Sequence, residues 1–322
     1  MERNQKEIQE KLQRKMEEEG FDALLLTRPE SIRYATGVTS AFMYLNIPIG
    51  NVIGIVPKTG NAAVVMSEFE GNAAKIDSPE IDVLGYPIFV YIADFDANGR
   101  MKDSQPNTDK AFHMAAEFIK EKLGAVKKIG VERPMFPYDR MLFLQEQFGE
   151  EVPQDCTQLL KDVTKFKTAW EIEVLRKNAQ ASQRAMSYVA KHTEIGMDEQ
   201  DILLLMNQGL VNEGKGFCST RQCNVVGEQF SPIYLPHTCY KLKEGDTVRL
   251  DGGINSNSYS SDISRTYFVG NKVSDERLKI WNILHDTFEK VFAMIGPGVR
   301  ICDIFKAAED NVKTVIPEYH RG

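Results

Sequence analysis

The hydrophobic and polar pattern of the first half of the chain predicts short buried strands that alternate with helices. Ile8, Leu12 and Met16 recur at helical spacing among Glu, Lys and Arg, so residues 2–19 are expected to form an amphipathic helix. Further helices are predicted at 31–37 and 110–123, and strands at 23–26, 51–56, 62–66 and 128–131. This alternation favours an α/β domain with its own core.

A different pattern begins at Lys165, where residues 168–191 predict one long helix. Its expected apolar stripe consists of Ile172, Leu175, Ala179 and Met186. Further helices are predicted at 197–213, 274–295 and 301–315, and strands at 247–253, 259–262 and 265–269. The change of pattern places a domain boundary near 150–165, so we expect a two-domain α/β protein with domains at 1–160 and 161–322.

The composition is that of an ordinary globular chain and narrows the range of partners. The 322 residues are 42% hydrophobic and 26% charged, and the net charge of −7 comes with scattered rather than clustered Lys and Arg. This argues against nucleic acid and membranes as partners. The charged first twenty residues contain no apolar signal-peptide core, and the five cysteines are odd in number and irregularly spaced. We therefore expect a cytoplasmic protein.

Two aspartates form the candidate site. Asp251 ends an apolar strand, and Asp262 is expected inside the next strand, after a turn rich in Asn, Ser and Gly. Carboxylates on paired antiparallel strands can face one cavity and bind divalent cations, and bridging carboxylates hold the paired ions of two-metal hydrolases. Two aspartates at this spacing are also common in solvated turns, so the spacing alone leaves both interpretations open.

The whole string around these aspartates resembles a known family signature. Residues 243–253 (KEGDTVRLDGG) and 259–266 (YSSDISRT) are similar to the signature of the pita-bread metallopeptidases, which include prolidase, aminopeptidase P and creatinase. Residues 16–26 and 32–37 resemble the opening of the family's N-terminal domain, and residues 167–176 its domain entry. The resemblance implies a creatinase-like N-terminal domain, a pita-bread catalytic domain and a homodimer.

The resemblance also implies roles for three residues. Asp251 would be the first metal ligand and Asp262 the bridging second ligand of two divalent ions, Mn, Co or Zn. His237 would contact the substrate or act as acid or base, with a small peptide containing an Xaa-Pro bond as the typical target. The segment from His237 to Asp251 is two or three residues shorter than in typical members, so an ordinary loop position is the alternative for His237.

The end of the sequence departs from the family pattern. Relatives continue beyond a segment like 319–322 into a His ligand and two Glu ligands, and His320 lies too early in that pattern to replace the His. We therefore expect an incomplete pita-bread domain, a fragment of a longer protein, and no catalytic metal pair or turnover in these 322 residues alone.

Two other functions stay open at this stage. One is a creatinase-like or lyase relative that acts on a small non-peptide substrate, and the other is a catalytically silent binding module. The retained pair Asp251 and Asp262 argues against a metal-free creatinase-like relative but not against a metal-using lyase. The same pair argues against a silent binding module in the parent protein, whereas the missing ligands favour that module for these 322 residues.

Overall fold

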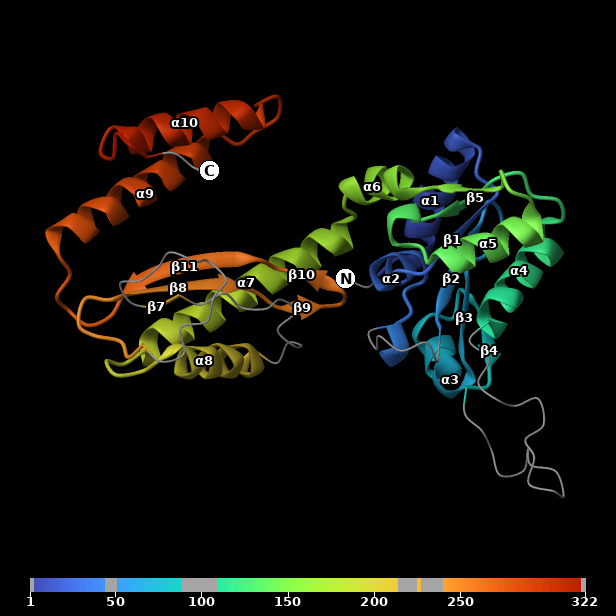
Figure 1. Ribbon diagram of the computed structural model, residues 1–322, viewed down its shortest axis with the longest axis horizontal. Coiled ribbons are helices and arrows are strands. Elements are labelled where there is room, and N and C mark those ends of the chain that lie inside the picture. The colour runs from blue at the N-terminus through green and yellow to red at the C-terminus, as the bar shows by residue number, and fades with distance from the viewer. Residues whose placement is uncertain (1–2, 44–50, 89–108, 214–224, 227–239, 320–322) are drawn as a thin grey trace, which may run out of the picture. The chain divides into compact units, whose positions relative to one another are not determined.

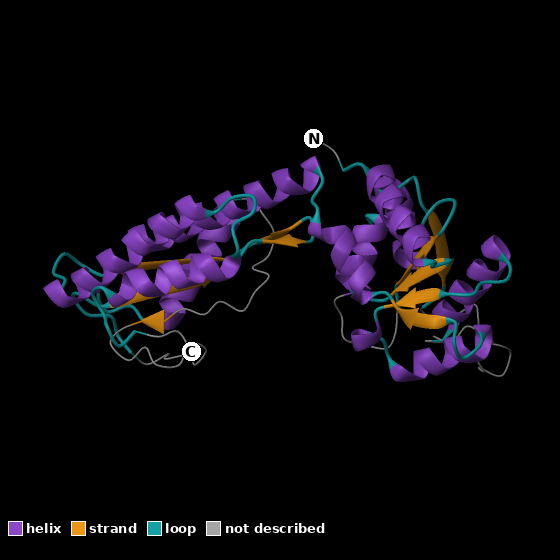
Figure 2. Ribbon diagram, turned by 90° about the horizontal axis from the view of Figure 1, so that it is seen from above, coloured by secondary structure: helices purple, strands orange, loops and turns teal. Residues whose placement is uncertain are grey.

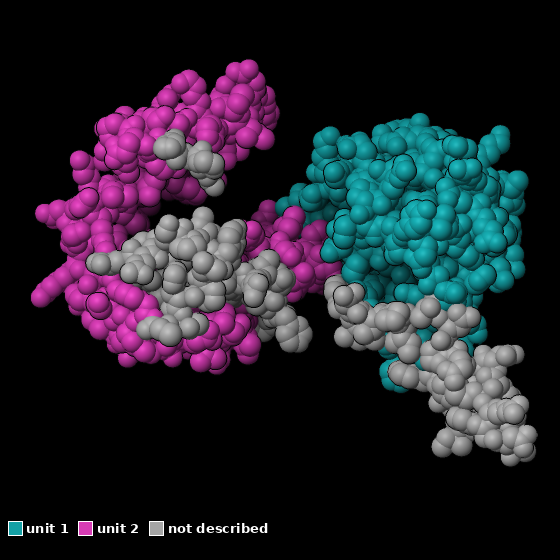
Figure 3. All heavy atoms as spheres, viewed as in Figure 1, with its two compact units in different colours: residues 1–173 teal, residues 174–322 magenta. Residues whose placement is uncertain are grey.

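The computed structural model describes residues 3–43, 51–88, 109–213, 225–226 and 240–319. The chain divides into two compact units, Met1–Glu173 and Val174–Gly322 (Figure 3). The predicted domain boundary at residue 160 lies inside helix α6 (Thr157–Lys165), and it stays a prediction. None of the described helices is long and apolar enough to cross a membrane.

A six-stranded sheet forms the centre of the N-terminal unit, with strand order β4-β3-β2-β1-β5-β6 (Figure 1). The strands are β1 (Ala23–Leu26), β2 (Ile53–Pro57), β3 (Ala63–Ser67), β4 (Asp82–Tyr86), β5 (Ile129–Val131) and β6 (Pro153–Asp155). β2 pairs antiparallel with β1 and with β3, and β1, β5 and β6 run parallel. The carboxyl ends of these three parallel strands therefore meet at one edge of the sheet.

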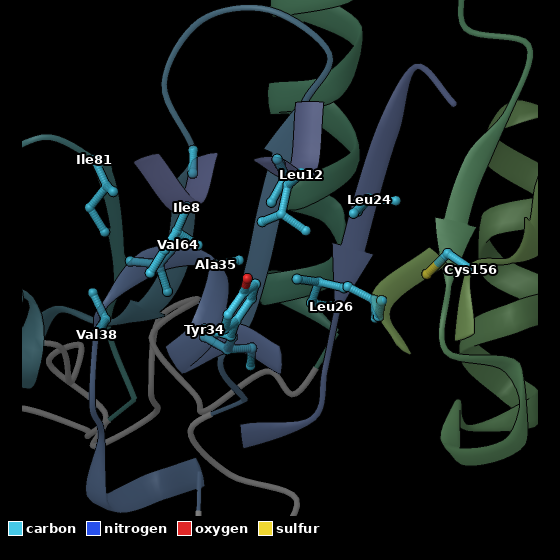
Figure 4. Packing of buried hydrophobic residues seen from close by; sticks show 14 of the residues in the cluster. Ile8, Leu12, Leu24, Leu26, Tyr34, Ala35, Val38, Val64, Ile81 and Cys156 are labelled. Carbon is cyan, nitrogen blue, oxygen red and sulfur yellow. The ribbon is translucent and has the colours of Figure 1, made fainter. Parts of the chain in front are cut away.

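Helices cover both faces of this sheet (Figure 2). They are α1 (Gln5–Glu19), α2 (Pro29–Thr36), α3 (Glu68–Asp77), α4 (Lys110–Leu123), α5 (Tyr138–Phe148) and α6, with short 3-10 turns η1 (Ala41–Met43) and η3 (Arg133–Met135). Leu24 and Leu26 pack on one face with residues of α1, α2 and α6 (Figure 4), whereas Ala23 and Leu25 pack on the other with α4 and α5. Because both faces are buried, β1 is apolar throughout rather than alternating.

The amphipathic N-terminal helix is confirmed. Ile8, Leu12 and Met16 are fully buried, and Asn4 accepts a hydrogen bond from the backbone N–H of Glu7 at the helix start. Gly20 ends α1 with φ 74°, a left-handed conformation that glycine adopts without steric cost.

Five helices and strands of this unit escaped the sequence prediction, namely α3, α5, α6 and the strands β4 and β6. β4 and β6 are the two edge strands, and only Tyr86 is buried in β4 while β6 has no buried residue. In α5 the single buried residue is Leu144. Elements at an edge bury little apolar surface, so their sequences carry little periodic signal.

The second unit contains a three-stranded antiparallel sheet of order β11-β8-β7 and a two-stranded ribbon. The elements are α7 (Ala169–His192), α8 (Glu199–Asn212), β7 (Val225–Val226), β8 (Thr247–Gly252), β9 (Asn255–Ser256), β10 (Tyr259–Ser260), β11 (Ile263–Phe268), α9 (Asp275–Met294) and α10 (Ile301–Lys313). Val248 and Leu250 of β8 pack in one core with residues of α7 and α8. Helices α9 and α10 contact each other through Thr287 and Asn311.

The predicted apolar stripe of α7 is partly wrong. Ile172 is 44% exposed, and Leu175 and Ala179 are only half-buried, although Met186 is buried as expected. The fully packed face instead includes two polar residues, Asn178 and Ser182. Their side chains bind strand backbone, so a count of apolar residues alone misplaced the buried face.

A buried acid lies at the shared carboxyl edge of β1, β5 and β6. Glu132, the residue after β5, is 4% exposed, and its Oε1 accepts a hydrogen bond of 2.8 Å from Ser31 Oγ. Arg28 Nη1 lies 3.7 Å from the same oxygen, whereas Oε2 is buried without a hydrogen-bond partner. Burial raises the pKa of the Glu132 carboxyl, and the Ser31 hydrogen bond and Arg28 only partly offset it.

We expect Glu132→Gln to remove a pH dependence from the stability of this unit. Because the pKa of Glu132 is higher in the folded state, its protonation stabilises the fold fully at pH values below 4.5, the ordinary pKa of Glu. This contribution to the free energy of unfolding is lost as the pH rises through the folded-state pKa. The free energy of unfolding of the variant should therefore exceed that of the parent by about 1 kcal/mol at pH 8, and this difference should shrink toward pH 4.5.

Denaturant unfolding across this pH range measures the difference. Glu10→Gln is the control, because it makes the same charge change at a side chain on α1 that is 56% exposed. Equal pH profiles for the parent and Glu132→Gln would contradict the expectation.

Candidate functional site

The pairing of β8 with β11 brings Asp251 and Asp262 to the same face of the sheet. Asp251 is directly opposite Ser264, and Asp262 lies two residues before Ser264. Ser261 and Ile263, on either side of Asp262, face the helices, so Asp262 points to the opposite side, as Asp251 does between Leu250 and Gly252. We call the side away from α7 and α8 the open face.

The strand predicted for 259–262 is shorter in the structure, and Asp262 is not inside a strand. β10 contains only Tyr259 and Ser260, which pair with β9 across a two-residue turn. The turn residues Asn257 and Ser258 both have positive φ, 55° and 62°, as type I′ hairpins require. Asp262 therefore occupies the link between the ribbon and β11.

Helix α7 holds this link in place through two buried polar side chains that the sequence analysis missed. Ser182 Oγ lies 2.8 Å from Ser261 Oγ and accepts a hydrogen bond from the Ile254 N–H at 3.1 Å. Asn178 Nδ2 donates to the carbonyl oxygens of Ser256 (3.2 Å) and Tyr259 (2.6 Å). Because they are four residues apart, Asn178 and Ser182 project from one side of the helix and anchor both ends of the ribbon.

Two further features fix the segments on either side of the aspartates. A Cβ at Gly253 would lie 1.9 Å from the Ser261 carbonyl oxygen, so only glycine permits this approach of the two chains. At the other end of β11, the hydroxyls of Tyr267 and Thr193 lie 2.6 Å apart, and burial raises the pKa of Tyr267 to about 12. The Tyr267 side chain therefore stays neutral at physiological pH and ties β11 to the end of α7.

A cation lies beside the first aspartate. Arg249 precedes Asp251 by two residues on β8, and its Nη2 is 3.4 Å from Asp251 Oδ2. Both side chains are partly exposed, 27% for Arg249 and 37% for Asp251. The period of two along a strand is the sequence signal that could have placed Arg249 on the face of Asp251.

The described residues match only part of a metal centre. Asp251 and Asp262 offer the carboxylate oxygens that divalent cations prefer. Within the described ranges, however, no group of three or more His, Cys, Asp or Glu could hold a metal ion. His237, the third predicted site residue, lies outside the described residues. The two carboxylates are thus of the right type for such ions but too few for a closed two-metal site.

Comparison with known proteins identifies two matching families. The creatinase/prolidase N-terminal domain model matches residues 9–163, and the model of metallopeptidase family M24 matches residues 173–320. The Xaa-Pro dipeptidase of Pyrococcus furiosus is 22% identical over 320 residues, which are 98% of this chain and 79% of the relative.

Solved structures share the fold at similar coverage. An Xaa-Pro dipeptidase from Bacillus anthracis superimposes with a TM-score of 0.76 at 20% identity, over 97% of this chain and 78% of the other. A recombinant prolidase from Thermococcus sibiricus gives a TM-score of 0.77 at 19% identity, over 98% and 78% of the two chains.

We expect Asn178→Ala to loosen the ribbon next to Asp262. The change leaves two strand carbonyls without their donor, which typically costs about 2 kcal/mol. Backbone amide exchange at Ile254 and Ser261 should therefore become faster by about an order of magnitude or more in the variant.

Hydrogen–deuterium exchange with peptide or residue resolution is the measurement. Gln183→Ala is the matched control, because Gln183 lies on the exposed side of the same helix. Unchanged exchange at 254–261 in Asn178→Ala would show that α7 does not anchor the ribbon.

Proposed function

The chain belongs to metallopeptidase family M24 and carries a creatinase/prolidase N-terminal domain. On that premise, we propose that it is part of a hydrolase of small peptides, of the Xaa-Pro dipeptidase type. The predicted fold class, a creatinase-like N-terminal domain followed by a pita-bread domain, is confirmed. The observation that supports the proposal is the pairing of β8 with β11, which sets Asp251 opposite Ser264, two residues after Asp262.

The proposed cofactors are two divalent ions, Mn, Co or Zn, with Asp251 and Asp262 among their ligands. Metal ions of this kind supply Lewis-acid chemistry and an activated water when bound in a complete site. His237 is the proposed contact for the peptide substrate. A homodimer and a cytoplasmic location are part of the same proposal, because they follow from the family resemblance and the composition.

One observation favours a second candidate, a peptide-binding module that works without metal. The Asp251 carboxylate already has a counter-charge in Arg249, at 3.4 Å. A carboxylate that is neutralised by arginine has less need of a metal ion, so a metal-free face could bind polar peptide groups. Metal content and turnover distinguish this candidate from the hydrolase.

We expect the 322-residue chain by itself to bind fewer than two catalytic metal ions and to show no turnover of an Xaa-Pro dipeptide. The physical reason is that a closed two-metal site needs more ligands than two carboxylates. Intact mass verifies the chain, and metal analysis with a dipeptide assay under added Mn²⁺, Co²⁺ or Zn²⁺ measures the outcome. Stoichiometric binding of two ions together with turnover would overturn the expectation.

In any form of the protein that hydrolyses an Xaa-Pro dipeptide, Asp262→Asn should lower kcat by about 10³-fold or more. A neutral amide cannot replace the charge of a carboxylate between two cations. Asp286→Asn provides the control, because its side chain is 75% exposed and lies on α9. Activity of Asp262→Asn equal to that of the parent would exclude the metal role of Asp262.

A further inference from the structure

Helix α9 carries an exposed apolar seam on a different side from the one that contacts α10 (Figure 1). On the α10 side, Thr287 is buried, Asn311 Nδ2 donates to Thr287 Oγ1 at 2.8 Å, and Lys290 Nζ donates to Asn311 Oδ1 at 2.9 Å. A helix turns by about 100° per residue, which brings six other positions together on the side away from these contacts. We call these positions the α9 seam: Leu278, Trp281, His285, Phe288, Phe292 and Ile295, the last directly after the helix.

The seam has the spacing of a coiled-coil contact surface. Its positions are separated by alternating steps of three and four residues, as are the a and d positions of a heptad repeat, which pack against another helix. Its five large hydrophobic side chains are 36–64% exposed, and the His285 side chain is half-exposed. A contiguous exposed patch of this kind marks an interaction surface. The spacing indicates that the partner is a helix with the same repeat.

The rings of the seam are already arranged in pairs within one chain. Trp281 and His285 are stacked, with ring centroids 5.0 Å apart and an interplanar angle of 18°. Phe288 and Phe292 are stacked in the same way, at 5.8 Å and 17°. Side chains that are already ordered lose less conformational entropy when a partner binds. The seam therefore offers two flat aromatic surfaces that need little rearrangement.

We propose that the α9 seam is the contact surface between two copies of this chain, which pair through antiparallel α9 helices. The steps of the seam are the same in both directions, so a two-fold axis at its centre brings every seam position opposite another seam position. The facing pairs, each with one residue from either copy, are Leu278 with Ile295, Trp281 with Phe292, and His285 with Phe288.

The chemistry of the seam is symmetric in the same way. Aliphatic side chains occupy its two ends, and rings occupy the four positions between them. Each layer of the pair therefore joins an aliphatic side chain to an aliphatic one, or a ring to a ring. Asn282 and Glu289 border the seam at e positions, which antiparallel pairing brings near each other as an amide and a carboxylate rather than as like charges. A second copy thus matches the seam in spacing, in side-chain type and in charge.

The inference deepens the proposed function, because a homodimer is part of that proposal and the seam names its contact surface. It does not depend on Asp251 or Asp262, which lie on a different part of the second unit.

Sedimentation velocity of the folded 322-residue chain, at about 1–100 µM, tests the proposal. The parent is expected to form a dimer, and Phe288→Glu is expected to weaken the dimer about 100-fold or more, because two-fold symmetry buries the introduced acid twice among rings. Circular dichroism checks that each variant is folded, and Phe292→Glu replaces Phe288→Glu if the latter is not. Leu204→Glu is the matched control, because it makes the same kind of change at an exposed position on α8.

A mixing experiment tests the antiparallel alignment. His285→Lys alone should also weaken the dimer, because it places an ammonium group against Phe288 of the second copy. In an equimolar mixture of Phe288→Glu and His285→Lys, the introduced acid of one chain faces the introduced amine of the other. The mixture should therefore form a heterodimer at least about tenfold more tightly than either variant pairs with itself.

The outcomes separate the seam from the rest of the proposed function. Loss of the dimer in Phe288→Glu, with recovery in the mixture and no change in Leu204→Glu, supports the proposal. A dimer that persists in Phe288→Glu and Phe292→Glu overturns the seam and keeps the homodimer, which then forms elsewhere. Loss without recovery in the mixture, or assemblies larger than a dimer, overturns the antiparallel pairing. A monomeric parent overturns both the seam contact and the homodimer, assigns the seam to another partner or to a segment of a longer form of the protein, and leaves the hydrolase proposal to its own tests.

Discussion

The candidate site depends on hydrogen bonds between one helix and the backbone of a short ribbon. Asn178 and Ser182 of α7 bind carbonyl and amide groups on both sides of the β9–β10 turn. These bonds position Ser261, and Ser261 is the neighbour of Asp262. The ribbon contains only two residue pairs and could not be stable by itself, so its geometry is imposed by the helix beneath it. The relative position of the two aspartates follows from this contact.

The candidate site also places two opposite charges, those of Arg249 and Asp251, next to each other on one strand. Asp251 lies on β8, the central strand of its sheet, and its side chain is partly exposed. Arg249 supplies the compensating charge from the same strand.

The N-terminal unit follows a different principle, because its sheet is buried on both sides. Strands β1 and β2 are apolar at every position, and the buried acid Glu132 follows the end of β5. Glu132 lies at that edge with one oxygen paired to Ser31 and the other unpaired. The buried carboxyl group of Glu132 thus lies after the end of a strand, whereas the two cores consist of hydrophobic side chains.

Much of this protein was determined by local sequence. The spacing of Ile8, Leu12 and Met16 predicted α1, and the signature around Asp251 and Asp262 identified the family. Such features could be found because helix and strand periods, and turn residues such as glycine, act over a few neighbouring positions.

Tertiary structure decided the rest, because it depends on contacts between distant segments. The edge strand β6 (PQD) is a strand only because β5 offers a partner, and Ser182 is buried because strand groups 72 and 79 residues away bind its hydroxyl. The distance from Arg249 to Asp251 likewise depends on how the core fixes the face of β8. Sequence patterns record which residues avoid water, whereas the partners of buried polar groups emerge only when the chain is folded.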